Sequence, residues 1–149
     1  MYGTDRDGVR RVFVDALRKA EEGRPLEPME RLVAEVLALH PEYHTLLRGG
    51  ESAVEREYPP EHGRSNPFLH MGLHIGLREQ VAVDRPAGVA ALYRRICLHT
   101  GDVHAAEHLM AECLAHALWE AQRAGTTPDD ARYLDCLRAI ADQPPARRP

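Results

Sequence analysis

Histidines and glutamates stand at helical spacing in two stretches of this chain. In residues 66–83, His70 and His74 are four positions apart. In the stretch 101–123, the nine residues 104–112 hold two further histidines at the same spacing, with two glutamates. Residues three or four apart share one face of a helix, and two helices that each present paired imidazoles can enclose a metal ion. The spacing therefore predicts a metal site between two helices. Its candidate ligands are His70, His74, His104, Glu107, His108 and Glu112.

This set of imidazoles and carboxylates suits zinc or non-haem iron. Zinc accepts His and Glu in a tetrahedral site, whereas non-haem iron favours His plus carboxylate with open positions. The candidates exceed the four ligands usual for zinc, so the sequence allows a dinuclear site or one ion with supporting residues around it. The spacings His-x-x-Glu and His-x-x-x-His differ from the Glu-x-x-His of di-iron bundles and are closer to a histidine-rich, haemerythrin-like site. If the site is catalytic, Glu107 or Glu112 is the candidate general base; whether the protein is an enzyme stays open.

The segment from His104 to His108 also matches the HxxEH pattern of inverted zinc proteases. In that pattern both histidines bind zinc, and the glutamate, here Glu107, is the general base. That class needs a further acidic ligand and a larger fold with a sheet, and neither is visible in the sequence. A peptidase is therefore disfavoured, and a small metal-dependent hydrolase is an alternative.

A metal-free protein is the second alternative. In this interpretation the histidines cap, pair and fill space, and the chain is a helical interaction or oligomerisation module that meets a protein partner or a second copy. Gly72 and Gly76 form a thin helix face that predicts very close packing. The polar residues 51–65 form a long connection, of a length that is often functional, and its first part, residues 51–58, could make a short helix. Either feature could be the docking surface.

His40 and His44 are four positions apart, but Pro41 lies between them. Because proline breaks or kinks a helix, the two histidines share a face only if a new helical turn starts at Pro41. In that case they could join the metal site. Otherwise His40 caps a helix and His44 is a surface-facing residue of a turn.

Composition and charge exclude several classes of function. The chain has 149 residues, 44% of them hydrophobic, which is enough for a core within one domain. The net charge is −4 without a basic excess, so nucleic acid is disfavoured as a partner. No apolar run approaches the roughly 18 residues of a membrane span, and the charged N-terminus does not resemble a signal peptide. We therefore expect a cytoplasmic protein that binds neither nucleic acid nor membrane.

The three cysteines of the chain stand apart from one another. Cys97, Cys113 and Cys136 lie in apolar helical stretches, and the sequence has no CxxC pair. Isolated cysteines in a cytoplasmic protein are typical of reduced core residues rather than of ligands or a disulfide. We therefore expect three free thiols.

Helical periodicity extends through most of the chain, and no strand-like alternation of useful length appears. Apolar stripes with start and stop signals predict helices over 4–22, 26–39, 66–83, 84–99, 102–125 and 127–140. Residues 41–50 are expected to form a turn that docks on them. The predicted fold is all-α, a single-domain bundle of about five to six helices over residues 1–143, with a disordered tail at 144–149.

Polar residues mark the starts of these helices. Asn66, before a proline, begins the helix of the first histidine pair, and Asp102 begins the helix of the second pair. Asp84 is the expected cap of the helix between them, and Thr127 begins a predicted capping box.

Three residues near the candidate ligands have other expected roles. Arg78 is expected to form surface ion pairs. Trp119 lies beside the row of ligands on its helix and could form a wall of the site. His116 lies off that row and is not a candidate ligand.

Long strings of the chain resemble a known family. They are NPFLHMGLHIGLREQ (66–80), DRPAG (84–88) and GDVHAAEHLMAECLAHALWEAQRAG (101–125). The family consists of small bacterial, chiefly proteobacterial, proteins that carry a domain of unknown function, and the resemblance covers residues 40–138. It implies a compact, mostly helical protein without an established activity. The family pattern includes the positions of all six candidate ligands and of Asp102, and an acidic residue is commoner at the position of His116.

Overall fold

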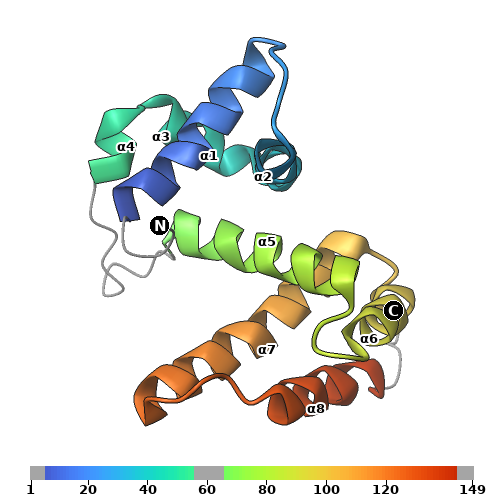
Figure 1. Ribbon diagram of the computed structural model, residues 1–149. Helices are drawn as coiled ribbons and strands as arrows, with labels where there is room; N and C mark the ends of the chain where they lie inside the picture. Colours follow the sequence, from blue (N-terminus) through green and yellow to red (C-terminus); the bar gives the residue numbers. More distant parts are fainter. Residues whose placement is uncertain (1–5, 56–65, 144–149) are drawn as a thin grey trace. The chain divides into compact units, whose positions relative to one another are not determined.

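Helices form all the regular structure in the part of the chain that the computed structural model describes, residues 6–55 and 66–143 (Figure 1). They are α1 (Arg6–Glu21), α2 (Pro28–Ala38), the 3₁₀ helix η1 (Pro41–Tyr43), α3 (His44–Arg48), α4 (Glu51–Glu55), α5 (Pro67–Val83), α6 (Val89–Thr100), α7 (Val103–Ala124) and α8 (Asp130–Ala141). The predicted all-α class is confirmed. The predicted count is too low, because Pro41 and Gly50 (φ 64°) divide the segment after α2 into short helices. Helix α4 lies where the sequence allowed a short helix at 51–58, and residues 56–65 of the predicted connection lie outside the described residues.

The chain divides into two compact units, Met1–Ile75 and Gly76–Pro149. The boundary falls within α5, so the first part of this helix belongs to the first unit and the rest to the second. A single domain over residues 1–143 stays a prediction, and the predicted tail at 144–149 lies outside the described residues. Among the described helices, none combines the length and the apolar character needed to cross a membrane.

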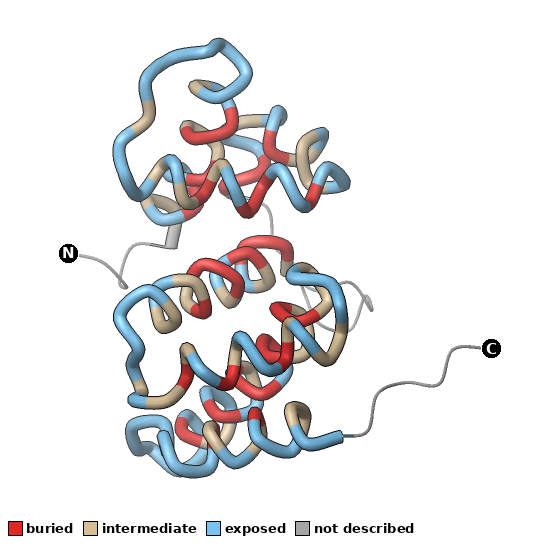
Figure 2. Tube along the Cα trace, turned by 90° about the vertical axis from the view of Figure 1, so that its right-hand side faces the viewer, coloured by how far each residue is buried: buried red, intermediate tan, exposed pale blue. Residues whose placement is uncertain are grey.

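The core of the first unit forms between α1, α2, α3 and the beginning of α5. Buried residues gather on one face of these helices, as Figure 2 shows. Phe13 of α1 and Phe68 of α5 meet edge to face with ring centroids 5.7 Å apart, a favoured geometry for aromatic pairs. The other core members are Ala16, Leu17, Val33, Val36, Leu37, Leu47, Met71 and Ile75.

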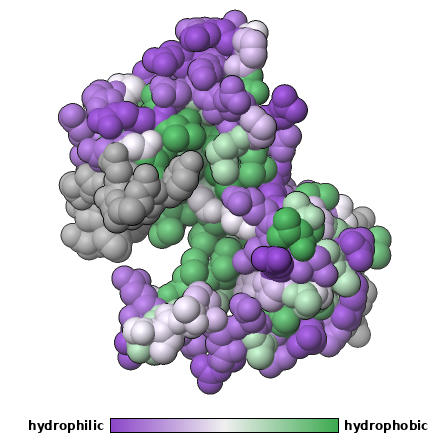
Figure 3. Space-filling view, in the orientation of Figure 1, coloured by the Kyte–Doolittle hydropathy of each residue, from purple (hydrophilic) through white to green (hydrophobic). Residues whose placement is uncertain are grey.

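Arg10 is a buried cation that joins three helices of the first unit. Its guanidinium donates a hydrogen bond to the carbonyl oxygen of Val54 in α4 at 2.9 Å and lies 5.0 Å from the ring centroid of Phe68 in α5. The neighbouring ion pair between Arg11 and Glu51 is exposed, so it contributes little to stability. Figure 3 shows mainly hydrophilic residues over the turn between α1 and α2.

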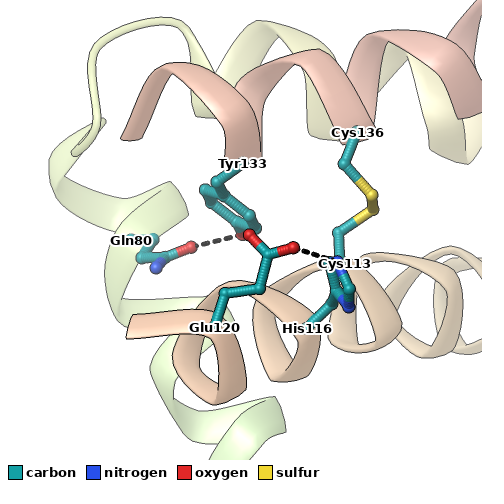
Figure 4. Close-up of a disulfide and its surroundings, with 6 residues drawn as sticks. All are labelled: Gln80, Cys113, His116, Glu120, Tyr133 and Cys136. Atoms are coloured by element: carbon teal, nitrogen blue, oxygen red, sulfur yellow. Dashed lines mark hydrogen bonds and ion pairs between the residues drawn. A yellow bond between two sulfur atoms is a disulfide. The ribbon is translucent and has the colours of Figure 1, made fainter. Parts of the chain in front are cut away.

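The second unit is built on α6, α7 and α8. A disulfide joins Cys113 of α7 to Cys136 of α8, with Cα atoms 5.9 Å apart (Figure 4). The expectation of three free thiols is therefore wrong, and Cys97 is the free cysteine of the described residues. Cysteines 23 positions apart on different helices meet only through helix packing, which their sequence spacing does not reveal. The surrounding core contains Leu77, Val89, Leu92, Ile96, Ala106, Met110, Leu114 and Leu137.

The two helices that carry the candidate ligands begin at the predicted caps. The side chain of Asn66 accepts hydrogen bonds from the backbone N–H groups of Phe68 and Leu69, at 2.9 and 3.3 Å. The carboxylate of Asp102 accepts one from the backbone N–H of His104 at 3.2 Å. These bonds satisfy N–H groups that have no partner inside the helix, so local sequence sets where both helices start.

Two other helix starts differ from the prediction. Helix α6 begins after Gly88 (φ 101°), and the carboxylate of Asp84 accepts hydrogen bonds from the backbone N–H groups of Gly88 and Ala90 instead of capping directly. The positive φ of Gly88 adds a turn before the helix can begin. Helix α8 begins after Asp129, not Thr127, and Asp129 accepts from the N–H of Arg132 at 3.1 Å. Aspartate is a somewhat stronger cap than threonine.

Candidate metal centre

Three imidazoles converge within the first unit. His40 follows α2, while His70 and His74 lie one turn apart on α5. The Nε2 atom of His70 is 3.2 Å from the Nε2 atom of His40 and 3.2 Å from that of His74. The side chains of His40 and His74 are buried, at 2% and 0% exposure. We call these three residues the imidazole cluster.

A backbone carbonyl orients the His40 ring. Its Nδ1 atom lies 2.8 Å from the carbonyl oxygen of Val36. A carbonyl can only accept, so Nδ1 carries the proton and, in the neutral ring, Nε2 presents a lone pair to the cluster. The ring also stacks on Tyr43, with centroids 5.6 Å apart and an interplanar angle of 7°. A ligating histidine typically donates its other N–H to a carbonyl or carboxylate in this way.

The spacing of the cluster matches coordination better than hydrogen bonding. Two nitrogens bound tetrahedrally to zinc at 2.0–2.1 Å are about 3.3 Å apart, close to the 3.2 Å of both contacts to His70. Hydrogen bonding between neutral rings accounts for the contacts less well. His40 has no Nε2 proton to donate, so one proton on His70 would have to serve both neighbours, or one contact would join two lone pairs.

His44 has a different role from His40. Its Nε2 atom lies 2.8 Å from the carbonyl oxygen of Leu37, so the ring donates to the C-terminal end of α2, where carbonyls lack partners within the helix. Between the two histidines, Tyr43 contacts both His40 and His70 with its ring. Burial, with a smaller effect of the charge of Glu42, raises the pKa of Tyr43, which therefore stays neutral.

The new helical turn at Pro41, on which a role for His40 and His44 depended, is the 3₁₀ helix η1. It brings His40 to the cluster but directs His44 to the carbonyl of Leu37. The HPEYH spacing was the signal for His40, yet the sequence alone left its role open, because its partners in the imidazole cluster lie 30 or more positions away.

The second pair of histidines lies on α7, in the second unit. The rings of His104 and His108 are in contact, with centroids 4.2 Å apart and an interplanar angle of 71°. Both side chains are partly buried. The four-residue spacing thus places the two imidazoles on one helix face, as predicted.

The glutamates of α7 differ sharply in environment. Glu107 is buried at 2% exposure, and its two carboxylate oxygens accept hydrogen bonds from Nε and Nη2 of Arg78, both at 3.2 Å. Arg78 therefore does not form the surface pair that the sequence predicted, because helix packing in the second unit brings a buried carboxylate to it. Glu112, in contrast, is exposed on α7.

Trp119 was expected to form a wall of the site, but it is 52% exposed. Its ring stacks on His116 and lies 4.7 Å from the guanidinium carbon of Arg123. The Nε2 atom of His116 lies 2.8 Å from a carboxylate oxygen of Glu120, one helical turn further along α7.

The glycine face of α5 is not closely packed in the described structure. A Cβ atom added at Gly72 would meet no described atom within 4 Å, and one added at Gly76 would meet only a side-chain atom of Leu114, at 3.8 Å. Neither glycine is tightly packed against another described helix, and close packing of this face against a partner or a second copy stays a prediction. The two glycines lie on a partly open helix surface.

Comparison with known proteins agrees with the resemblance seen in the sequence. The family model described as "Domain of unknown function (DUF1841)" matches residues 5–139, which is most of the chain. No curated protein and no solved structure matches the chain.

Proposed function

The chain belongs to the DUF1841 family of unknown function, and we propose from the geometry of its imidazole cluster that it is a metal-binding protein. The observation that carries the proposal is the convergence of three Nε2 atoms, with His70 3.2 Å from both His40 and His74. A divalent ion bound by these atoms would link the end of α2 to α5. Because unfolding separates such ligands, binding energy becomes folding energy.

Zinc suits this cluster better than iron. All ligand atoms of the cluster are imidazole nitrogens, which bind zinc in tetrahedral sites. Non-haem iron favours a carboxylate beside the histidines. The candidate carboxylates are Glu107, which is engaged by Arg78, and Glu112, which is exposed on α7. A dinuclear centre with Glu107 as a ligand would require this carboxylate to leave Arg78.

From the sequence we further propose His108 as a ligand, because it stands one helical turn after His104 and directly follows Glu107. Within the second unit, the buried carboxylate of Glu107 pairs with Arg78.

Hydrolysis by an HxxEH mechanism is less well supported than metal binding. A general base needs a free lone pair directed at a water molecule, whereas both oxygens of Glu107 accept hydrogen bonds from Arg78. An ion with an open coordination position would supply an activated water. The burial of His40 and His74 favours a closed, structural site instead.

From the sequence we further propose a cytoplasmic protein that could associate with a second copy or another protein.

Elemental analysis of the protein purified without chelator tests the proposal. We expect about one equivalent of zinc per chain, lost in His70→Ala and His74→Ala. His44→Ala is the matched control, because His44 also binds a carbonyl of α2 but lies outside the cluster. A wild-type protein that neither carries zinc nor binds it on addition refutes the proposal. Zinc that persists in both cluster variants also refutes it.

A further inference from the structure

The disulfide between α7 and α8 lies outside the candidate metal centre and is independent of the proposed function. Its two cysteine residues differ in exposure: Cys113 is buried at 3% exposure, whereas Cys136 is only partly buried. We propose that this bond is a reversible thiol–disulfide site, which an external dithiol opens by attacking Sγ of Cys136.

The attack is directed by access to sulfur. A thiolate must approach the sulfur that it attacks, so the more accessible sulfur reacts first and the other departs. Cys113 lies on the core-facing side of α7, between the buried residues Met110 and Ala117. Cys136 projects from α8, which covers α7 from one side (Figure 4). Cys136 is therefore the attacked residue and Cys113 the leaving group.

The chemistry balances with a dithiol as the reductant. A thiolate of the dithiol bonds to Sγ of Cys136, the Cys113–Cys136 bond breaks, and Cys113 leaves as a thiolate that takes up a proton. The second thiol of the reductant then attacks the reductant sulfur that is bonded to Cys136 in the mixed disulfide. Cys136 departs as a thiolate and takes up a proton, and the reductant ends with an internal disulfide. Two electrons pass from the dithiol to the protein, which gains two thiols.

Other contacts hold α8 in place when the bond is open, which makes the reaction reversible. Tyr133 and Leu137 are buried at 3% and 0% exposure. The hydroxyl of Tyr133 donates to the side-chain oxygen of Gln80 at 2.7 Å (Figure 4). With α8 still docked, the two cysteines keep a Cα separation near 5.9 Å, within the range that a disulfide requires. The disulfide can therefore form again without a rearrangement of α8, because the two thiols stay close together.

Cys97 is not part of this exchange. It lies on α6 as a free cysteine, and burial is the main reason that the pKa of its thiol is raised. A raised pKa leaves little thiolate at neutral pH. Replacing Cys97 by Ser therefore removes a background thiol without touching the disulfide.

Trapping the mixed disulfide tests the proposed direction of attack. The oxidised Cys97→Ser protein is treated briefly with glutathione, quenched in acid and digested with trypsin. Cys136 then lies in the peptide 133–138, because arginines stand at 132 and 138, and Cys113 lies in a different peptide. We expect the glutathione adduct on the Cys136 peptide. An adduct mainly on Cys113, or three free thiols in native wild-type protein after mild oxidation, overturns the proposal.

Matched single-thiol variants give a second, independent reading. In the Cys97→Ser background, Cys113→Ser leaves only Cys136, and Cys136→Ser leaves only Cys113. We expect the Cys136 thiol to react with an aromatic disulfide reagent at least about tenfold faster than the Cys113 thiol. Both rates should become equal in denaturant. Equal rates in the native proteins, with helical content unchanged, contradict the proposal.

Discussion

Replacing His40 or His44 by alanine should separate metal binding from helix capping. Both rings donate to carbonyls of α2 over the same distance, 2.8 Å, but only His40 belongs to the imidazole cluster. Both variants lose a helix-end hydrogen bond. Only His40→Ala should lose the stabilisation that zinc provides.

The expected magnitudes follow from burial and from linkage. Loss of one hydrogen bond costs about 1 kcal/mol, which is the expected cost of His44→Ala without metal. His40 is 2% exposed, so its truncation also leaves a cavity and should cost about 2 to 4 kcal/mol. At a free zinc concentration about 100 times Kd, bound zinc adds about 2.7 kcal/mol to the wild type. If loss of one ligand raises Kd about a hundredfold, this increment falls to about 0.4 kcal/mol.

Urea unfolding followed by helical circular dichroism, with zinc and with chelator, measures this increment directly. Because each variant is measured with zinc and with chelator, the cost of the cavity at His40 is present in both measurements and cancels from their difference. We expect His44→Ala to keep the full increment and His40→Ala to lose most of it. An increment unchanged in His40→Ala, or lost equally in both variants, would refute the reasoning.

Three further predictions concern other parts of the molecule. Reduction of Cys113–Cys136 opens a loop that spans 23 positions. On the chain-entropy model this should lower the free energy of unfolding by about 3 kcal/mol. A decrease of less than about 1 kcal/mol in denaturant titrations would show that the disulfide does not stabilise the fold by restricting the unfolded chain. Burial, followed by a hydrogen bond with the thiol of Cys97, raises the pKa of Tyr93 from 10.0 to about 12. The stability that Tyr93 contributes is therefore complete below pH 10 and lost as the pH rises towards 12, and unfolding measured against pH should show a weaker alkaline loss in Tyr93→Phe. Gly72→Ala should raise the free energy of unfolding by about 1 kcal/mol, because no described atom lies within 4 Å of the new Cβ; a melting temperature lowered by this substitution would indicate close packing at Gly72.

The sequence by itself determined the features that arise within one helix or at its ends. Asn66 and Asp102 begin the two ligand-bearing helices because a side chain can bond to N–H groups two or three residues along the same chain. The contact between His104 and His108 follows from the helical repeat in the same way. Where several turn residues compete, as before α6 and α8, the sequence located the helix but not its first residue.

Only the tertiary structure decided which helices meet and which side chains face each other there. Cys113 finds Cys136 across 23 positions, Arg78 finds Glu107 across 29, and His40 reaches His70 across 30. None of these partners has a fixed spacing, since each depends on how whole helices pack their apolar faces. A carboxylate or imidazole that is buried away from water needs a hydrogen-bond, ionic or metal partner. Only the packed structure determines which partner lies within reach.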